Sequence, residues 1–176
     1  MTLPTVVDTL QIQAPAYVRK LRRRSDWGDP SDEPAQRAKV AVEKLFRTQS
    51  QPEISIYLIS NDEDLRRVAL GMNAGRDSLK ESVPFVAFRS EELRTLGIEA
   101  TQTPGDLPCG HASSLHYDMI ATDDQLLTLC SKAMTCGRVA ANCTTGMMKE
   151  VVQEAISEGC RTAVPSGTCS VAVCNS

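Results

Sequence analysis

The strongest strand signals are two short apolar runs in the first half of the chain. More and less apolar side chains alternate over Glu53–Ser60, which predicts a strand, and a second apolar run spans Val83–Phe88. The 22 residues between them, 61–82, carry apolar side chains at helical spacing, and Ser60 with Glu63 matches a capping box at the start of this helix. The order strand, helix, strand is typical of a βαβ unit.

Helical spacing of apolar residues recurs in several other segments. A proline or a short polar residue lies at or just before the start of each of them, and a glycine follows two of them, as is usual at helix ends. Further helices are therefore expected over Ala16–Arg24, Pro34–Arg47, Glu91–Leu96, Asp123–Ala141 and Thr145–Glu158. The stretches Ser25–Glu33 and Ile98–Pro108, rich in Pro, Gly and Asp, are expected to be loops.

The C-terminal tail has the pattern of a β-hairpin. Arg161–Val164 and Thr168–Cys174 are its predicted strands, and Pro165–Gly167 is the turn between them. Together these elements predict a single α+β (or α/β) domain, with a small mixed sheet covered by about five helices and a C-terminal β-hairpin. Residues 1–30 are interpreted as an N-terminal arm with a basic helix, and residues 31–176 as the mixed α/β domain.

Composition restricts the partners and the compartment. The net charge is −3 and aromatic residues make up 4% of the 176-residue chain, so neither electrostatic attraction to nucleic acid nor base stacking is expected. The sequence shows no secretory signal and no apolar run of about 20 residues, so no membrane partner is expected. Seven cysteines without such a signal indicate a reducing compartment, and we expect a cytoplasmic protein.

A cluster of cations follows the N-terminal arm. Five of the six residues from position 19 to position 24 are Arg or Lys, and the single tryptophan comes shortly afterwards. The cluster predicts an interaction surface for an acidic partner, made by Arg19, Lys20, Arg22, Arg23, Arg24 and Trp27. In the alternative interpretation the cations form a solvated helix face balanced by downstream acidic residues, and the tryptophan packs at the edge of the core.

The stretch from Gly105 to Cys143 holds both histidines and four of the seven cysteines. Cys109, His111 and His116 lie close together in this stretch. Three interpretations stay open. The first is a metal site, for which zinc is the metal that these ligands suit. The second is a nucleophilic Cys109, activated by a nearby imidazole that Asp118 or another carboxylate orients. The third is a structural turn with hydrogen-bonded histidines. The spacing matches no specific signature, so no cofactor is assigned.

The later cysteines do not complete a metal site if they share one helix. On the predicted helix Cys130 lies in the apolar stripe, while Cys136 and Cys143 are about 10 Å apart along the axis. Zinc–sulfur bonds are about 2.3 Å long, so one ion could not bind both thiolates. At most one of the three cysteines can therefore join Cys109 and the histidines.

Two main classes of function follow. No complete catalytic set is present, which favours a non-enzymatic interaction or regulatory protein, a component of a larger intracellular bacterial assembly with another protein as its partner. The alternative is a small thiol- or zinc-dependent enzyme centred on Cys109, His111 and His116. A further alternative rests on the Ser/Thr/Cys-rich C-terminal tail, whose composition resembles that of a precursor modified on this segment.

Overall fold

One sheet organises the part of the chain that the structure describes. The computed structural model describes residues 15–21, 24–46, 52–73, 82–105, 110–136 and 139–144, together with Gln153 and Ser157. The strands in these residues are β1 (Ala16–Lys20), β2 (Ile54–Ile59), β3 (Ser82–Arg89), β4 (Glu99–Gln102), β5 (His116–Ile120) and β6 (Val139–Thr144). The helices are η1 (Arg24–Trp27), α2 (Pro34–Ala41), η2 (Val42–Phe46), α3 (Asp62–Asn73), α4 (Ser90–Thr95), α5 (Gly110–Ser114) and α6 (Asp123–Thr135).

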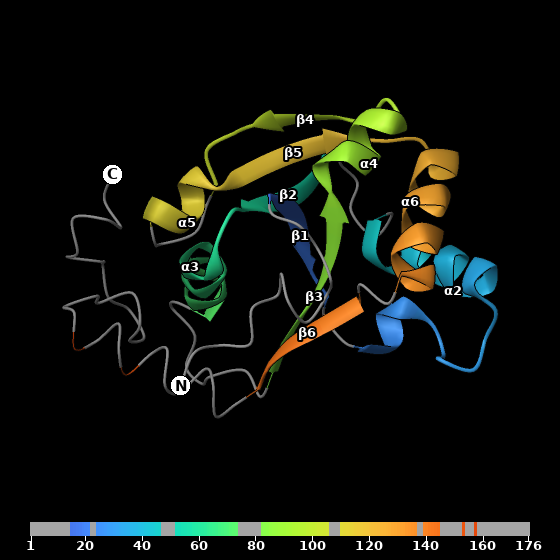
Figure 1. Ribbon diagram of the computed structural model, residues 1–176, viewed down its shortest axis with the longest axis horizontal. Coiled ribbons are helices and arrows are strands. Elements are labelled where there is room, and N and C mark those ends of the chain that lie inside the picture. The colour runs from blue at the N-terminus through green and yellow to red at the C-terminus, as the bar shows by residue number, and fades with distance from the viewer. Residues whose placement is uncertain are drawn as a thin grey trace.

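The sheet is antiparallel, and its strand order is β4-β5-β2-β1-β3-β6 (Figure 1). β1 lies inside the sheet, where it pairs with β2 on one side and with β3 on the other. The helix predicted over Ala16–Arg24 is therefore wrong over β1. Ala16 and Val18 are buried on one face of the sheet, and backbone bonding to two neighbouring strands outweighs the cation-rich local composition. β1 thus belongs to the same sheet as the strands that follow residue 31.

The predicted strand–helix–strand unit is present, but another strand separates its two strands. β1 runs antiparallel to both β2 and β3, so these two strands are parallel to each other without being neighbours. α3 connects them. Its cap differs from the predicted capping box: Asn61 Oδ1 accepts the Asp64 N–H (2.9 Å), and Asp64 Oδ2, not the Glu63 carboxylate, accepts the Ser60 N–H (2.8 Å).

Helices cover both faces of the sheet (Figure 1). α2, η2 and α6 pack against the face that carries Tyr17, Ile56 and Tyr117, whereas α3 and α5 pack against the opposite face, which carries Tyr57 and His116. A large apolar cluster fills the space between the sheet and the helices α2, η2 and α6. Its most buried members include Leu21, Trp27, Ile54, Ile56, Phe88, Leu126 and Leu129. The predicted α+β fold class is confirmed.

Two strands occupy segments that were predicted otherwise. β4 lies within the predicted loop Ile98–Pro108, and β6 replaces the last turns of the helix predicted over Asp123–Ala141. α6 begins as expected after Thr122 but ends at Thr135. Cys143 therefore lies on an edge strand, and the prediction that it shares one helix with Cys130 and Cys136 is wrong.

The C-terminal predictions fall mostly outside the described residues. Gln153 and Ser157 are the described positions of the predicted last helix, and both are helical. The predicted hairpin over residues 161–174 lies outside the described part. Among the helices that the structure describes, none is both long enough and apolar enough to cross a membrane.

Candidate functional site

Of the three residues predicted to form a reactive site, only His116 has a side chain that the structure describes. His116 is the first residue of β5, and the residue as a whole is 8% exposed. His111 lies in α5, and the structure describes its backbone but not its side chain. Cys109 lies outside the described residues. Within the described ranges no group of three or more His, Cys, Asp or Glu side chains is arranged to hold a metal ion. The convergence of these three residues stays a prediction.

The predicted basic surface is partly committed to the fold. The guanidinium of Arg19 donates to the carbonyls of Ser55 (2.6 Å) and Leu45 (2.7 Å), and it lies 5.2 Å from the centre of the Phe46 ring. Arg19 therefore ties β1 to β2 and to the end of η2. Trp27 is 1% exposed in the apolar cluster, as in the alternative interpretation. Arg22 and Arg23 lie outside the described residues, and the side chain of Arg24 is not described.

A polar network surrounds the imidazole of His116. Nδ1 lies 2.9 Å from Thr103 Oγ1, and Thr103 Oγ1 donates to Asp118 Oδ2 (2.8 Å). His116 Nε2 lies 3.7 Å from Asp118 Oδ1, and the ring packs edge-on against Tyr57 with a centroid separation of 5.2 Å. Ser55 Oγ lies 3.5 Å from the same carboxylate. Asp118 thus lies beside an imidazole, as the nucleophile interpretation expected, but the ring is bonded within the sheet.

The proton pattern of the network follows from the single hydroxyl proton of Thr103. Because Thr103 gives that proton to Asp118, its oxygen can only accept from the imidazole, so His116 Nδ1 carries a proton. The chain Nδ1–H to Thr103, and Thr103 O–H to Asp118, links β5 to the residue that follows β4. This network holds the end of β4 in place.

The segment after β4 is held against α5 by further bonds. The Thr103 N–H donates to the His116 carbonyl (3.2 Å), and Gln102 Nε2 donates to the Ser114 carbonyl (2.7 Å). Ser113 Oγ donates to the Gly105 carbonyl (2.7 Å). A Cβ atom at position 105 would lie 2.9 Å from His116 Cβ, so the close approach of the chain to the imidazole requires a glycine.

The start of β4 is fixed as well. Gly97 has φ 67° and ends α4 in the left-handed conformation, as the sequence predicted. The Ile98 N–H donates to the Leu93 carbonyl (2.9 Å), and Gln125 Nε2 donates to the Leu96 carbonyl (2.8 Å). β4 is therefore a short strand that is anchored at both ends.

The register of β4 against β5 determines which backbone groups face outward. Glu99 pairs with Ile120, Thr101 with Asp118, and the Thr103 N–H continues this register by bonding to His116. Hydrogen-bonded and non-hydrogen-bonded pairs alternate along an antiparallel ladder. Positions 99, 101 and 103 therefore point their backbone groups towards β5, whereas positions 100 and 102 point theirs away from it.

The outer edge of β4 is free within the described part of the chain. β4 is the outermost strand of the sheet and pairs only with β5 (Figure 1). The N–H and C=O groups of Ala100 and of Gln102 point away from β5 and have no described partner on the outer side. Such a row of groups is a template for another strand, although the shortness of β4 limits it to a segment of similar length.

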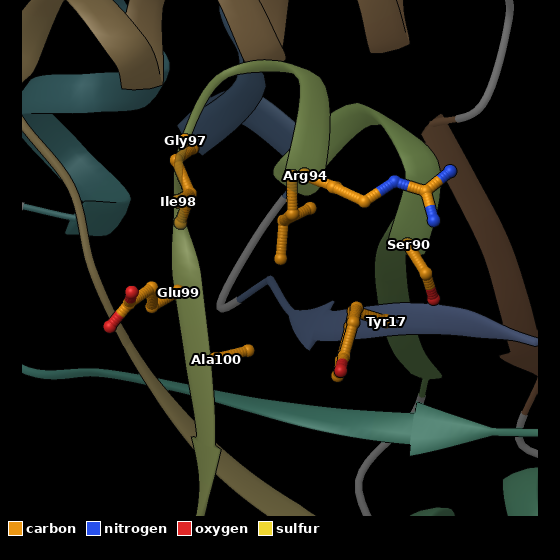
Figure 2. Close-up of a pocket in the computed structure, with 8 residues that line it drawn as sticks. Tyr17, Ser90, Arg94, Gly97, Ile98, Glu99 and Ala100 are labelled. Atoms are coloured by element: carbon orange, nitrogen blue, oxygen red, sulfur yellow. The ribbon is translucent and has the colours of Figure 1, made fainter.

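A pocket of about 340 Å³ lies between α4 and β4 (Figure 2). Its walls are formed by Tyr17, Ser90, Leu93, Arg94 and the residues from Gly97 to Ala100. Figure 2 shows the side chain of Ala100 directed from β4 towards Tyr17. The Tyr17 ring packs edge-on against Tyr117 at 5.4 Å, and burial, helped by this neighbour, raises the pKa of the Tyr17 hydroxyl. The hydroxyl is therefore neutral at physiological pH and can donate or accept.

The sequence contained little signal for this site. β4 reads Glu-Ala-Thr-Gln, without apolar alternation, because both of its faces are largely exposed. Asp118 and His116 share one face of β5 through their spacing of two residues, but the strand itself was not predicted. The polar residues at positions 116 and 118, which alternate with Tyr117 and Met119, would have been the usable signal.

Comparison with known proteins identifies no relative. No protein-family model, no curated protein and no solved structure matches the chain.

The alternation along β4 predicts amide exchange rates. The amides of Thr101 and Thr103 should exchange slowly because they bond to β5, and those of Ala100 and Gln102 should exchange at least about tenfold faster. Residue-resolved hydrogen exchange by NMR measures this difference. The reverse pattern would show that the outward groups belong to the other positions.

The Thr103 network predicts a local stability effect. Thr103→Val removes the donor to Asp118 and the acceptor for His116, and should lower the free energy of unfolding by about 2 kcal/mol. Thr101→Val is the matched control, because Thr101 is exposed and should change the free energy by less than about 0.5 kcal/mol. Urea unfolding of both variants checks this. Equal effects would mean that the network does not anchor β4.

The two cysteines whose side chains the structure describes, Cys130 and Cys136, should differ in reactivity. Cys130 is fully buried, and burial raises the pKa of its thiol, whereas Cys136 is exposed at the end of α6. Brief alkylation of the folded protein at neutral pH should label Cys136 and spare Cys130 until urea is added. Peptide mapping by mass spectrometry reads this out, and labelling of both at one rate would contradict it.

Proposed function

We propose that this chain is a non-enzymatic interaction protein that binds an extended segment of a partner protein along the outer edge of β4. The observation that supports the proposal is the set of outward N–H and C=O groups of Ala100 and Gln102 on a strand anchored at both ends. Strand addition to a sheet edge is a recurring mode of peptide recognition, in which main-chain bonds give affinity.

Anchoring favours binding at this edge. A strand that is already ordered needs little further ordering on binding, so more of the interaction free energy is available for affinity. β4 is four residues long, and Pro104 lies two residues after its end, which limits pairing to a short segment. These features suit a specific peptide and work against open-ended sheet extension.

The placement of His116 fits this proposal better than the enzymatic alternative. Its side chain is 10% exposed, Nδ1 bonds to Thr103, and Nε2 faces Asp118. In this arrangement the imidazole holds the end of β4 instead of facing a substrate. A regulatory role inside a larger assembly, in the cytoplasm, is part of the same proposal, and the free thiols of Cys130 and Cys136 accord with a reducing compartment.

A proline at position 100 tests strand addition. Ala100→Pro removes an outward N–H without removing a bond to β5, because proline is tolerated where the N–H faces solvent on an edge strand. Ala100→Ser is the matched control and keeps the N–H. We expect peptides selected from a phage-displayed random library on the wild-type protein to bind the Ser variant equally, and to bind the Pro variant at least about tenfold more weakly.

Fluorescence anisotropy of labelled peptides measures these affinities, and urea unfolding verifies that the Pro variant is folded. Should that variant fail to fold, exchange protection of the Ala100 and Gln102 amides of the wild-type protein on peptide binding provides the test. A library that yields no binding peptide, equal binding by the Pro variant, or protection elsewhere in the chain would each contradict the proposal.

A further inference from the structure

Backbone bonds at β4 are too few to give selective binding by themselves. The outer edge offers four groups, the N–H and C=O of Ala100 and of Gln102. Main-chain bonds also do not discriminate between partner sequences. Selectivity for a sequence must come from side-chain pockets beside the strand. The pocket between α4 and β4 is such a pocket, because Glu99 and Ala100 of β4 belong to its wall (Figure 2).

The register determines which partner residue reaches the pocket. Side chains of paired residues on neighbouring strands project to the same face of a sheet. The partner residue bonded to Ala100 therefore projects to the face on which Ala100 points towards Tyr17 (Figure 2). Ala100 itself is small and half-buried, so the space beside it is open to a larger side chain from the added strand.

The lining of the pocket indicates the chemistry of its occupant. Leu93 and Ile98 give it aliphatic walls, and the Tyr17 ring adds an aromatic surface. A volume of about 340 Å³ has room for one large side chain. The hydroxyl of Tyr17 has no hydrogen-bond partner among the described residues. These features suit a large apolar or aromatic side chain, including one with a polar end.

Arg94 adds a charge requirement at the rim. It is exposed on α4, and no described carboxylate lies within ion-pair distance of its guanidinium. Ser90, one turn earlier on α4, places a hydroxyl on the same side of the pocket as the Arg94 side chain (Figure 2). The Ser90 hydroxyl donates to the Pro15 carbonyl (3.4 Å), so the guanidinium of Arg94 is the group at this rim that is complementary to a carboxylate.

We infer that the pocket receives a large apolar or aromatic side chain of an extended acidic peptide, at the residue paired with Ala100, while Arg94 binds a carboxylate of the same peptide. This inference rests on the proposed strand addition at β4. It assigns the partner to one class: a segment with one large apolar anchor, flanked by Asp or Glu.

Two substitutions test the inference separately from strand addition. Ala100→Leu keeps the outward N–H but fills the pocket with a side chain of β4 itself. It should lower the affinity for the selected peptides at least about tenfold relative to Ala100→Ser. Arg94→Glu reverses the charge at the rim of the pocket and should lower the affinity for the selected peptides by a similar factor, whereas Arg94→Lys should change this affinity less than about threefold. Fluorescence anisotropy at moderate salt measures all four variants, and urea unfolding verifies that each is folded.

The peptides give a second readout that does not depend on the variants. Selected sequences should share one large apolar or aromatic position with an acidic residue nearby, and alanine at the apolar position should lower affinity at least about tenfold. If binding requires the Ala100 N–H while Ala100→Leu binds normally and the peptides share no such position, the pocket inference fails and strand addition stands. If Ala100→Pro binds normally, both fail.

Discussion

The hydrogen bond from the Thr103 N–H to the His116 carbonyl fixes the register of β4 against β5, and so determines which backbone groups of β4 face outward. It places positions 99, 101 and 103 against β5 and leaves positions 100 and 102 facing outward. A shift of one residue would invert this set and would also move Ala100 off the pocket face. The Thr103, His116 and Asp118 side chains stabilise this register, so a partly buried polar network determines what the exposed backbone can bind.

β1 is an interior strand of the sheet, and it joins the strands on its two sides. It pairs with both strands of the β2–α3–β3 unit, and Arg19 links it to the carbonyls of Ser55 and Leu45. Tyr17 on the same strand forms the aromatic surface of the pocket beneath α4. The central strand and the candidate binding edge are therefore connected through Tyr17, which lies against Tyr117 of β5.

Sequence patterning predicted the elements whose burial is one-sided or whose ends have strong local signals. β2, β3 and α3 have clear periodicity, and Gly97 ends α4 as expected. β1 was missed because Arg19 and Lys20 follow its apolar start, and long cationic side chains can pass along a sheet with their charged ends bonded elsewhere. β4 was missed because an edge strand with two exposed faces has no apolar pattern to detect. The site depends on a register between β4 and β5, and no local sequence signal specifies a register.

The most direct test of the account replaces single backbone amides of β4 by esters, which removes one N–H and leaves the side chain unchanged. An ester at Ala100 should weaken peptide binding at least about tenfold, and an ester at Thr101 should lower the free energy of unfolding by about 1 kcal/mol more than the ester at Ala100 does. If the ester at Thr101 were the one that weakened binding, and the ester at Ala100 the one that lowered stability, the assigned edge would be wrong.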